Sequence, residues 1–492
     1  MTAVSEQRVE TSPSGAALPA QHGRGLDAGV PLVVLAAAFV AAQPLSDPDV
    51  WWHLRTGELI LEEGLVSADP WSFMSAKHWQ LHEWLSEVLM YAAYAAAGYA
   101  GVVGLVSVTV ACFAGVLTVS CRRVSRPIIA CTTALMAVAA TIPGMGARPQ
   151  VVSWLLLAVA APYMRSCVRR RRLPWWLLPL VWLWANLHGL WLTALALYAA
   201  LVIGLALEEG LRGWRTTAGF SGVGLLAVLA AAATPAGPAL LMAPFRVREY
   251  AQFVSEWDPP SIASVPTALA VALAFFVVVG WARAASPVPA STIAFVAAAV
   301  GMGLLYGRTV PVLAIAVAPL AAQALQGLRG PRQPEFRMDV RLALASAVVA
   351  VVAVPALAPA LSRASAPRPD GPLTTTAPAV LAATDAVQQL PGRARVLNQY
   401  ELGGWLLWAA RDTSPAIDGR AEIYEVEHVR GYVDAVGMRP GWRDFVEDLD
   451  ADAAMLLRDA PLAAGLELIG WELHYEQEGL VVLVPPTTSR GA

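Results

Sequence analysis

The chain has 492 residues, of which 57% are hydrophobic and only 14% are charged. Because an ordinary soluble protein carries about 25% charged residues, this composition excludes a typical water-soluble protein and indicates a polytopic membrane protein. The net charge of −3 lacks the basic excess that would contact nucleic-acid phosphates, so we expect no nucleic-acid partner. The four cysteines lie in or beside apolar segments and match no zinc-binding spacing.

Residues 1–27 are rich in Ser, Gly, Ala and Pro, which predicts a disordered cytoplasmic tail. Residues 28–361 contain eleven apolar runs, interpreted as membrane-spanning helices. The second run is longer than one span needs, and we expect its start, 87–99, to lie along the membrane surface. The eleven runs are 28–45, 88–120, 127–143, 150–164, 174–186, 189–207, 217–234, 264–282, 289–306, 309–327 and 342–361.

Arginine-rich loops follow every even-numbered run and orient the chain. The positive-inside rule places such loops in the cytoplasm. The N-terminus is then cytoplasmic, and the part of the chain that follows the eleventh run lies on the outer side of the cell membrane. The arginines that carry this argument are Arg122, Arg123, Arg126, Arg165, those at 169–172, Arg212, Arg215, Arg283, Arg329, Arg332, Arg337 and Arg341.

The first outer loop, 46–85, is unusually long and polar. It holds five tryptophans and three histidines. Asp47 and Pro48 are expected to begin a helix, with the Asp47 carboxylate as its N-cap, and Gly64 is expected to end it. The structural alternative is that Asp47 only caps this helix and the tryptophans only anchor it at the membrane interface.

One face of this helix carries candidate chemistry. Asp49, Trp52 and His53 have i, i+3, i+4 spacing, and Thr56 extends the same face by one turn. A carboxylate and an imidazole one turn apart are a candidate general base or metal site. Asp49 lies in the first turn, where the helix dipole lowers the pKa of a carboxyl.

The other outer loops collect the remaining polar residues of the membrane region. Arg148, His188 and Arg308 lie at ends of predicted spans, and Glu256 lies in a further outer loop. Ionisable groups that converge on one face of a membrane protein indicate a functional site. The alternative for each arginine is that its side chain only reaches the interface from the end of a span.

The C-terminal part predicts a linker, 362–379, rich in Pro, Ser and Thr, followed by a small extracytoplasmic α/β domain, 380–492, which we expect to fold alone. Asp418, Arg420 and Glu422 are interpreted as a salt-bridged loop, with a functional site at this strand end as the alternative. Strands are expected at 395–397, 416–417, 471–473 and 480–484, and helices at 405–411, 422–435 and 442–458.

Two motifs resemble those of a known class of enzymes. The run 47–55, DPDVWWHLR, is similar to the first outer loop of the membrane-embedded GT-C glycosyltransferases, above all the catalytic subunits of oligosaccharyltransferases. The run 254–259, VSEWDP, is similar to their later Ser-Glu motif. Their Trp-Trp-Asp-Tyr-Gly motif is absent here. The resemblance implies a polytopic α-helical protein of GT-C architecture with the small C-terminal α/β domain outside.

The resemblance also implies a reaction, in which a sugar moves from a polyprenyl-phosphate-linked donor to a glycan, lipid or protein acceptor at the outer membrane face. Asp47 and Asp49 are the expected catalytic acids. Asp47 is preferred as the base, because the first acid of this loop is the one aligned with the acceptor. The residues expected to bind substrate or membrane lipid are His53, Arg55, Arg148, His188, Glu256 and Arg308.

Two further questions stay open at the level of sequence. The first is whether Asp49, together with Asp47 or Glu256, holds a Mg²⁺ or Mn²⁺ ion, since these ions prefer oxygen ligands. The second is whether the protein has a non-enzymatic role instead, either as a scaffold or as a transporter-like subunit of envelope assembly. Transporters show repeated halves and polar residues within spans, whereas these spans are almost purely Ala, Leu and Val.

Overall fold

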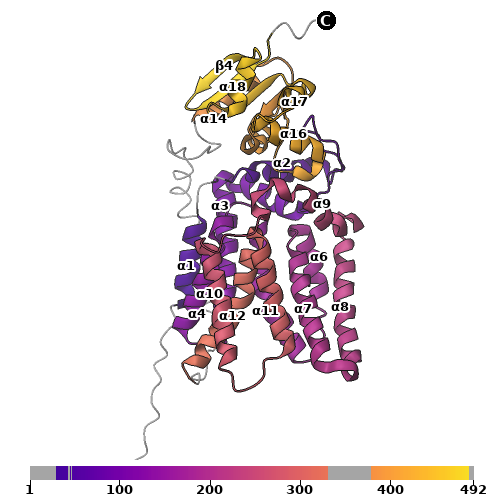
Figure 1. The fold of residues 1–492 in the computed structure, drawn as a ribbon, viewed down its shortest axis with the longest axis vertical. Coiled ribbons are helices and arrows are strands. Elements are labelled where there is room, and N and C mark those ends of the chain that lie inside the picture. Colours follow the sequence, from indigo (N-terminus) through magenta and orange to yellow (C-terminus); the bar gives the residue numbers. More distant parts are fainter. Residues whose placement is uncertain (1–28, 43–44, 46, 331–377, 487–492) are drawn as a thin grey trace, which may run out of the picture.

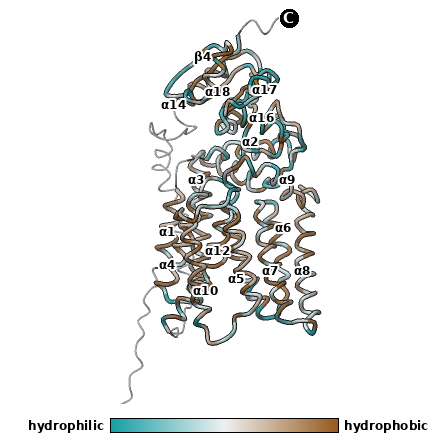
Figure 2. The backbone as a smooth tube through the Cα atoms, viewed as in Figure 1, coloured by the Kyte–Doolittle hydropathy of each residue, from teal (hydrophilic) through white to brown (hydrophobic). Residues whose placement is uncertain are grey.

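A computed structural model describes residues 29–42, 45, 47–330 and 378–486. They form a bundle of apolar helices with a folded region at one end (Figure 1). We call this region the cap; it comprises 47–85, 234–264 and 378–486. Figure 2 shows that hydrophobic residues dominate along the bundle, whereas hydrophilic residues gather at its ends and in the cap. This distribution is that of a multi-pass membrane protein.

The bundle helices coincide with the first ten apolar runs, and the eleventh, 342–361, lies outside the described residues. Helices suit these runs because every backbone polar group within the membrane must be bonded internally. Within the described residues, five segments are able by length and composition to cross a membrane, and four shorter apolar helices accompany them. The bundle helices are α1 (Gly29–Ala41), α3 (Trp84–Arg122), α4 (Pro127–Ala139), α5 (Gln150–Arg169), α6 (Leu177–Leu187), α7 (Trp191–Glu209), α8 (Trp214–Ala232), α10 (Val265–Ala282), α11 (Ala290–Leu305) and α12 (Val310–Leu328).

Helix α3 bends near its start, where the sequence predicts a change of direction. Ala97 and Gly98 leave helical geometry, and the φ of Gly98 is +61°, which glycine adopts without the penalty of a β-carbon. The first part of α3 packs against α2 (Asp49–Glu63). Gly57 permits this contact, because a β-carbon there would lie 2.2 Å from the backbone oxygen of Glu87.

The arginine-rich loops lie at the end of the bundle opposite the cap. Figure 1 shows the α7–α8 and α10–α11 connections at that end, and they carry Arg212 and Arg283. The positive-inside rule therefore favours an outer position for the cap, and the side of each terminus stays a prediction. The predicted tail 1–27 and most of the predicted linker 362–379 lie outside the described residues.

The C-terminal domain contains a five-stranded mixed sheet with the order β2-β1-β3-β5-β4. The pairs β1–β2 and β1–β3 are parallel, and β3–β5 and β4–β5 are antiparallel. Helices make the crossovers that parallel strands require. Its elements are α14 (Pro378–Gln388), β1 (Ala394–Asn398), α15 (Gly403–Ala409), β2 (Thr413–Pro415), α16 (Val426–Val436), α17 (Trp442–Leu449), β3 (Ala453–Leu457), α18 (Pro461–Leu468), β4 (Glu472–Gln477) and β5 (Leu480–Val484).

Parts of this domain differ from the sequence prediction. The segment 442–458, expected as one helix, forms α17 and then the central strand β3. The β3 sequence AAMLL is buried on both faces and lacks the alternation that marks a half-buried strand, so periodicity alone cannot separate strand from helix there. The sequence also does not predict α14 or α18, and strand β2 lies slightly before the expected 416–417.

The domain shares its hydrophobic core with the first outer loop. Trp71 and Trp79 from the loop belong to the same buried cluster as Ile417 and Tyr424 from the domain. An isolated fragment 365–492 would expose this shared surface to water, at a cost proportional to the apolar area. We therefore expect the domain to need the loop for folding, which replaces the expectation of an independent unit.

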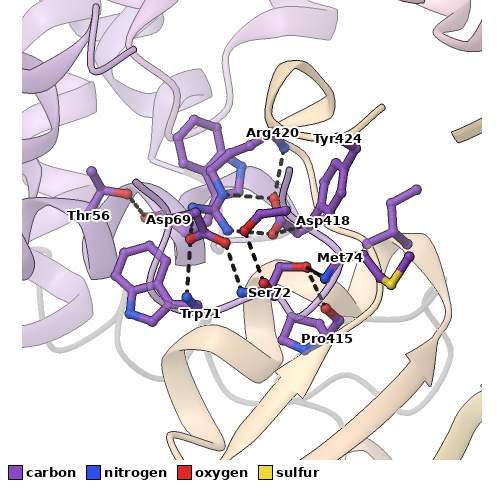
Figure 3. Close-up of polar contacts among 12 residues, drawn as sticks. Thr56, Asp69, Trp71, Ser72, Met74, Pro415, Asp418, Arg420 and Tyr424 are labelled. Carbon is purple, nitrogen blue, oxygen red and sulfur yellow. Dashed lines mark hydrogen bonds and ion pairs between the residues drawn. The ribbon is translucent and has the colours of Figure 1, made fainter. Parts of the chain in front are cut away.

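A buried ion pair fastens the loop to the domain (Figure 3). The Arg420 side chain is fully buried and donates to Asp418 Oδ2 at 2.6 Å and to Asp69 Oδ1 at 2.8 Å. Its guanidinium carbon lies 5.0 Å from the ring centroid of Trp71 and 4.7 Å from that of Trp79, within cation–π range. The predicted salt bridge between Asp418 and Arg420 is present, and its second acid comes from the loop.

Candidate functional site

A cavity of about 480 Å³ lies between the bundle and the cap. Its walls come from the start of α2, the segment 78–83, the start of α5, the α6–α7 turn, the segment 243–257, the α11–α12 connection and the C-terminal domain. Acids, arginines and histidines dominate its polar lining. They are Asp49, Glu83, Glu256, Glu401, Glu422, Arg148, Arg246, Arg308, His53, His78, His82 and His188.

Arg148 organises one wall of this cavity. Its Nε lies 2.5 Å from Asp47 Oδ2, and its Nη2 lies 3.1 Å from Asp49 Oδ2. Its Nη1 donates to Glu256 Oε1 at 2.6 Å. Three carboxylates share one guanidinium, so ionisation of all three leaves two negative charges unbalanced. Such an excess favours the protonated form of one of the acids.

Asp49 has the perturbed acidity that this charge balance predicts. Burial raises its pKa, Arg148 opposes the rise, and Asp47 adds to it, with the result that the pKa is about 6. Oδ1 of Asp49 accepts a hydrogen bond from Trp52 Nε1 at 3.1 Å, and 23% of the Asp49 side chain stays exposed. The sequence predicts a lowered pKa from the helix dipole, but burial and neighbouring acids outweigh that effect.

Asp47 does not line the cavity, whereas Asp49, two residues later in the chain, does. Its Oδ1 accepts the backbone N–H of Asp49 at 3.0 Å, as the predicted cap requires, and α2 ends before Gly64 as predicted. Its Oδ2 faces Arg148 and the backbone of Gly146, where a β-carbon would lie 2.5 Å from this oxygen. Both carboxylate oxygens of Asp47 are therefore engaged within the protein.

Glu83 and two histidines form a second charged wall. Glu83 Oε1 lies 3.4 Å from His82 Nε2 and 3.6 Å from His188 Nε2. Burial opposes ionisation of Glu83, but His188 and His82 hold its pKa below the usual range. Burial also lowers the pKa of His82, but its hydrogen bond to Glu83 outweighs burial and raises that pKa to about 9. At neutral pH, Glu83 is ionised and His82 is protonated.

His188 is neutral and has a fixed tautomer. Burial lowers its pKa to about 4. Its Nδ1 accepts the N–H of Leu190 at 3.3 Å. Ser153 Oγ accepts from Trp184 Nε1 at 2.6 Å and lies 2.9 Å from His188 Nδ1, so the Ser153 hydroxyl donates to that nitrogen. The proton of His188 therefore resides on Nε2, on the side of Glu83.

Two arginines of the cavity have no carboxylate partner within the described part of the chain. The guanidinium carbon of Arg308 lies 5.6 Å from the ring centroid of Trp257. Arg246 Nη1 donates to Gln80 Oε1 at 3.2 Å. Arginine binds phosphate oxygens through two parallel N–H donors. Arg308 and Arg246 are thus the cations that this cavity offers to an anionic ligand.

Six of the eight predicted site residues line the cavity, and Asp47 and Arg55 do not. The guanidinium of Arg55 pairs with Glu58 and its carbon lies 5.5 Å from the Trp71 ring centroid. The helical repeat turns Arg55 away from Asp49. The six that converge are Asp49, His53, Arg148, His188, Glu256 and Arg308.

The predicted metal ligands, Asp49 and Glu256, both face Arg148. Within the described residues, no three His, Cys, Asp or Glu side chains converge as a metal-binding set. A divalent ion between Asp49 and Glu256 would have to displace the guanidinium. The residues present therefore do not fit the predicted metal.

Sequence reasoning missed several members of this site. Glu83 directly follows His82 at the end of the outer loop, and this acid–imidazole pair was the available signal. Glu422 was assigned to the salt-bridged loop, but it lines the cavity, and burial raises its pKa. Arg246 lies in a segment without a recognisable motif, so only the fold brings it to the site.

Comparison with known proteins gives one informative result. No protein-family model and no curated protein matches the sequence. The crystal structure of ArnT from Cupriavidus metallidurans bound to undecaprenyl phosphate is similar, with a TM-score of 0.51 over 94% of this chain and 98% of that chain. The chain has a GT-C-like fold. At 14% sequence identity the likeness establishes the fold alone, and it confirms the architecture that the outer-loop motifs predict.

Proposed function

We propose that the protein is a membrane glycosyltransferase that moves a sugar from a polyprenyl-phosphate-linked donor to an acceptor at the outer membrane face. The observation that carries the proposal is the set of side chains that line the cavity. Asp49, with a pKa near 6, shares it with Arg308 and Arg246, which no described carboxylate neutralises. A base and phosphate-binding cations thus meet at the boundary of a GT-C membrane bundle. The undecaprenyl phosphate bound to ArnT supports the choice of donor.

The proposed reaction uses these groups in one displacement. The acceptor hydroxyl attacks the anomeric carbon, and its proton passes to the Asp49 carboxylate. The bond from the anomeric carbon to the phosphate oxygen breaks, and its electron pair leaves with the polyprenyl phosphate. A carboxylate with pKa near 6 is well matched to this role at neutral pH. Arg308 and Arg246 stabilise the charge that develops on the leaving phosphate.

The remaining walls of the cavity suit a sugar. Trp52, Trp257 and Tyr400 line it with aromatic surface, which packs against the apolar faces of sugar rings. Glu83 and His188 offer a hydrogen-bond acceptor and a donor to sugar hydroxyls. Arg148 holds Asp49 and Glu256 on one wall, which fixes the position of the base before substrate binds.

The proposal is tested with purified full-length protein. Binding of undecaprenyl phosphate is compared with that of undecaprenol, and we expect binding to depend on the phosphate. Undecaprenyl-phospho-hexoses and -pentoses are then added together with cell-envelope extract as the source of acceptor. We expect release of undecaprenyl phosphate from at least one donor. Equal binding of the alcohol, together with no release from any donor, would overturn the proposal.

A further inference from the structure

A second cavity, also of about 480 Å³, lies at the arginine-rich end of the bundle. Helices α3, α5 and α12 and the residues just beyond α3 and α5 form its walls. Among the described residues four arginines and no Asp or Glu line it: Arg123, Arg165, Arg169 and Arg170. We call this space the arginine recess. Every charged side chain that the structure describes in its lining is an arginine, whereas the cavity beneath the cap is lined by both acids and bases.

Two prolines explain why the helices leave space here. Pro162 lies inside α5 and Pro319 lies inside α12, and both line the recess. A proline within a helix removes one backbone hydrogen bond and its ring pushes against the preceding turn. Ser166 and Gln323 add neutral hydrogen-bonding groups to the same wall. The recess is therefore built from helix geometry and polar side chains together.

Arg165 is the central cation of this recess. Its Nε is buried and has no hydrogen-bond partner among the described residues, and its guanidinium carbon lies 5.8 Å from the ring centroid of Phe295. Arg171, from the same basic segment, shows the alternative, because it pairs with both Glu208 and Glu209. Acids of the chain thus neutralise Arg171, whereas no described acid pairs with Arg165, which lines the recess. An unsatisfied buried donor there is costly.

We propose that the arginine recess binds a phosphate group. Guanidinium groups bind phosphate oxygens in pairs, and Ser166 and Gln323 supply further hydrogen bonds. An anionic phospholipid headgroup is the source that the location favours, because basic pockets between helices at this membrane face bind such lipids. This inference is independent of the proposed transferase reaction, whose cavity lies at the opposite end of the bundle.

The test uses full-length protein purified in detergent. Retention of phosphatidylglycerol and of zwitterionic phosphatidylcholine is measured by native mass spectrometry, and inorganic phosphate is added as a competitor. We expect phosphatidylglycerol to bind about tenfold or more tightly than phosphatidylcholine, since one charge-assisted contact is worth about that factor. Arg165→Gln should remove most of this preference. Arg170→Gln, at an exposed position, should weaken it without threatening the fold.

The control is Arg212→Gln, at the same end of the bundle but outside the recess; it should retain the preference. Binding of phosphatidylglycerol that millimolar phosphate does not displace assigns the site to a lipid headgroup. Displacement by phosphate, or direct phosphate binding lost in Arg165→Gln, assigns it to a free phosphate group. Equal retention of the two lipids without phosphate binding, or equal loss in Arg212→Gln and Arg165→Gln, would overturn the proposal.

Discussion

Arg148 and Arg420 are both held by carboxylates, but their surroundings differ. The side chains of Arg420 and of its partners Asp69 and Asp418 are fully buried. Arg148 keeps 20% of its side chain exposed and faces the cavity beneath the cap. Arg420 forms ion pairs with two carboxylates, whereas Arg148 forms ion pairs with three.

The acidities of the attached carboxyls show what this difference does. Burial raises the pKa of both Asp418 and Asp49. At Asp418, the charge and hydrogen bonds of Arg420 outweigh burial, so the pKa is lowered. At Asp49, the positive charge of Arg148 is shared among three carboxylates, and the pKa of Asp49 rises to about 6. A buried cluster whose positive and negative charges nearly balance stabilises the fold. An acid-rich cluster that faces a cavity and contains a carboxyl with a raised pKa is typical of a functional site.

Breaking the closed pair should have the largest effect. Arg420→Met leaves Asp69 and Asp418 buried without their cation, so we expect about 3–5 kcal/mol of destabilisation, measured by thermal and denaturant unfolding of the full-length protein. Arg439→Met, which breaks an exposed pair with Asp434, is the matched control and should cost about 1 kcal/mol or less. Equal effects of the two variants would mean that the buried pair does not fasten the cap.

Removing Arg308, which pairs with no carboxylate among the described residues, should affect ligand binding instead. Arg308→Ala deletes a charge-assisted contact worth about 1.5–3 kcal/mol, so undecaprenyl phosphate should bind about tenfold or more weakly in equilibrium titration. Arg283→Ala, at the opposite end of the bundle, should bind as wild type does. An unchanged affinity of Arg308→Ala would remove this arginine from the phosphate site.

The raised pKa of Asp49 predicts a pH dependence of sugar transfer. The base is the ionised form, which is lost as the pH falls through about 6. At pH 5 about one tenth of the carboxyl is ionised, so kcat/KM should fall about tenfold between pH 7 and pH 5. The unfolding midpoint is followed over the same range to exclude loss of folded protein. A flat profile would show that Asp49 does not act as the base.

Asp47→Asn should have the smallest effect. Asparagine is also a good N-cap, and the Asp47 side chain does not line the cavity. We expect a stability change of about 1 kcal/mol or less and transfer within a few-fold of wild type. A hundredfold loss of transfer with normal stability would return the role of base to Asp47.

The membrane architecture was predictable because it is local in sequence. Apolar runs and arginine-rich loops each act within a few residues and marked the bundle, and the excess length of the second run indicated the change of direction in α3. The acid-rich helix start at Asp49 was predictable for the same reason. The order of the sheet was not, because β3 is buried on both faces and its apolar sequence also suits a helix.

The relation between Asp47 and Asp49 required three-dimensional structure. Both acids start the same helix, and only the position of Arg148, about one hundred residues later in the sequence, shows which acid faces the cavity. Local helix reasoning gave the wrong direction for the pKa of Asp49, since burial and Glu256 come from other segments. The pairing of Asp69 with Arg420 likewise depends on distant chain segments meeting.

The most direct test of the transferase proposal is the rate of sugar transfer by Asp49→Asn. Asparagine keeps the size of the side chain and an oxygen for the Trp52 hydrogen bond, and it removes one of three crowded charges. We therefore expect an unfolding midpoint equal to or above that of wild type, with transfer reduced about 100-fold or more. Glu62→Gln, at an exposed position of the same helix, should transfer at the wild-type rate. Transfer by Asp49→Asn at the wild-type rate would contradict the assignment of Asp49 as the base.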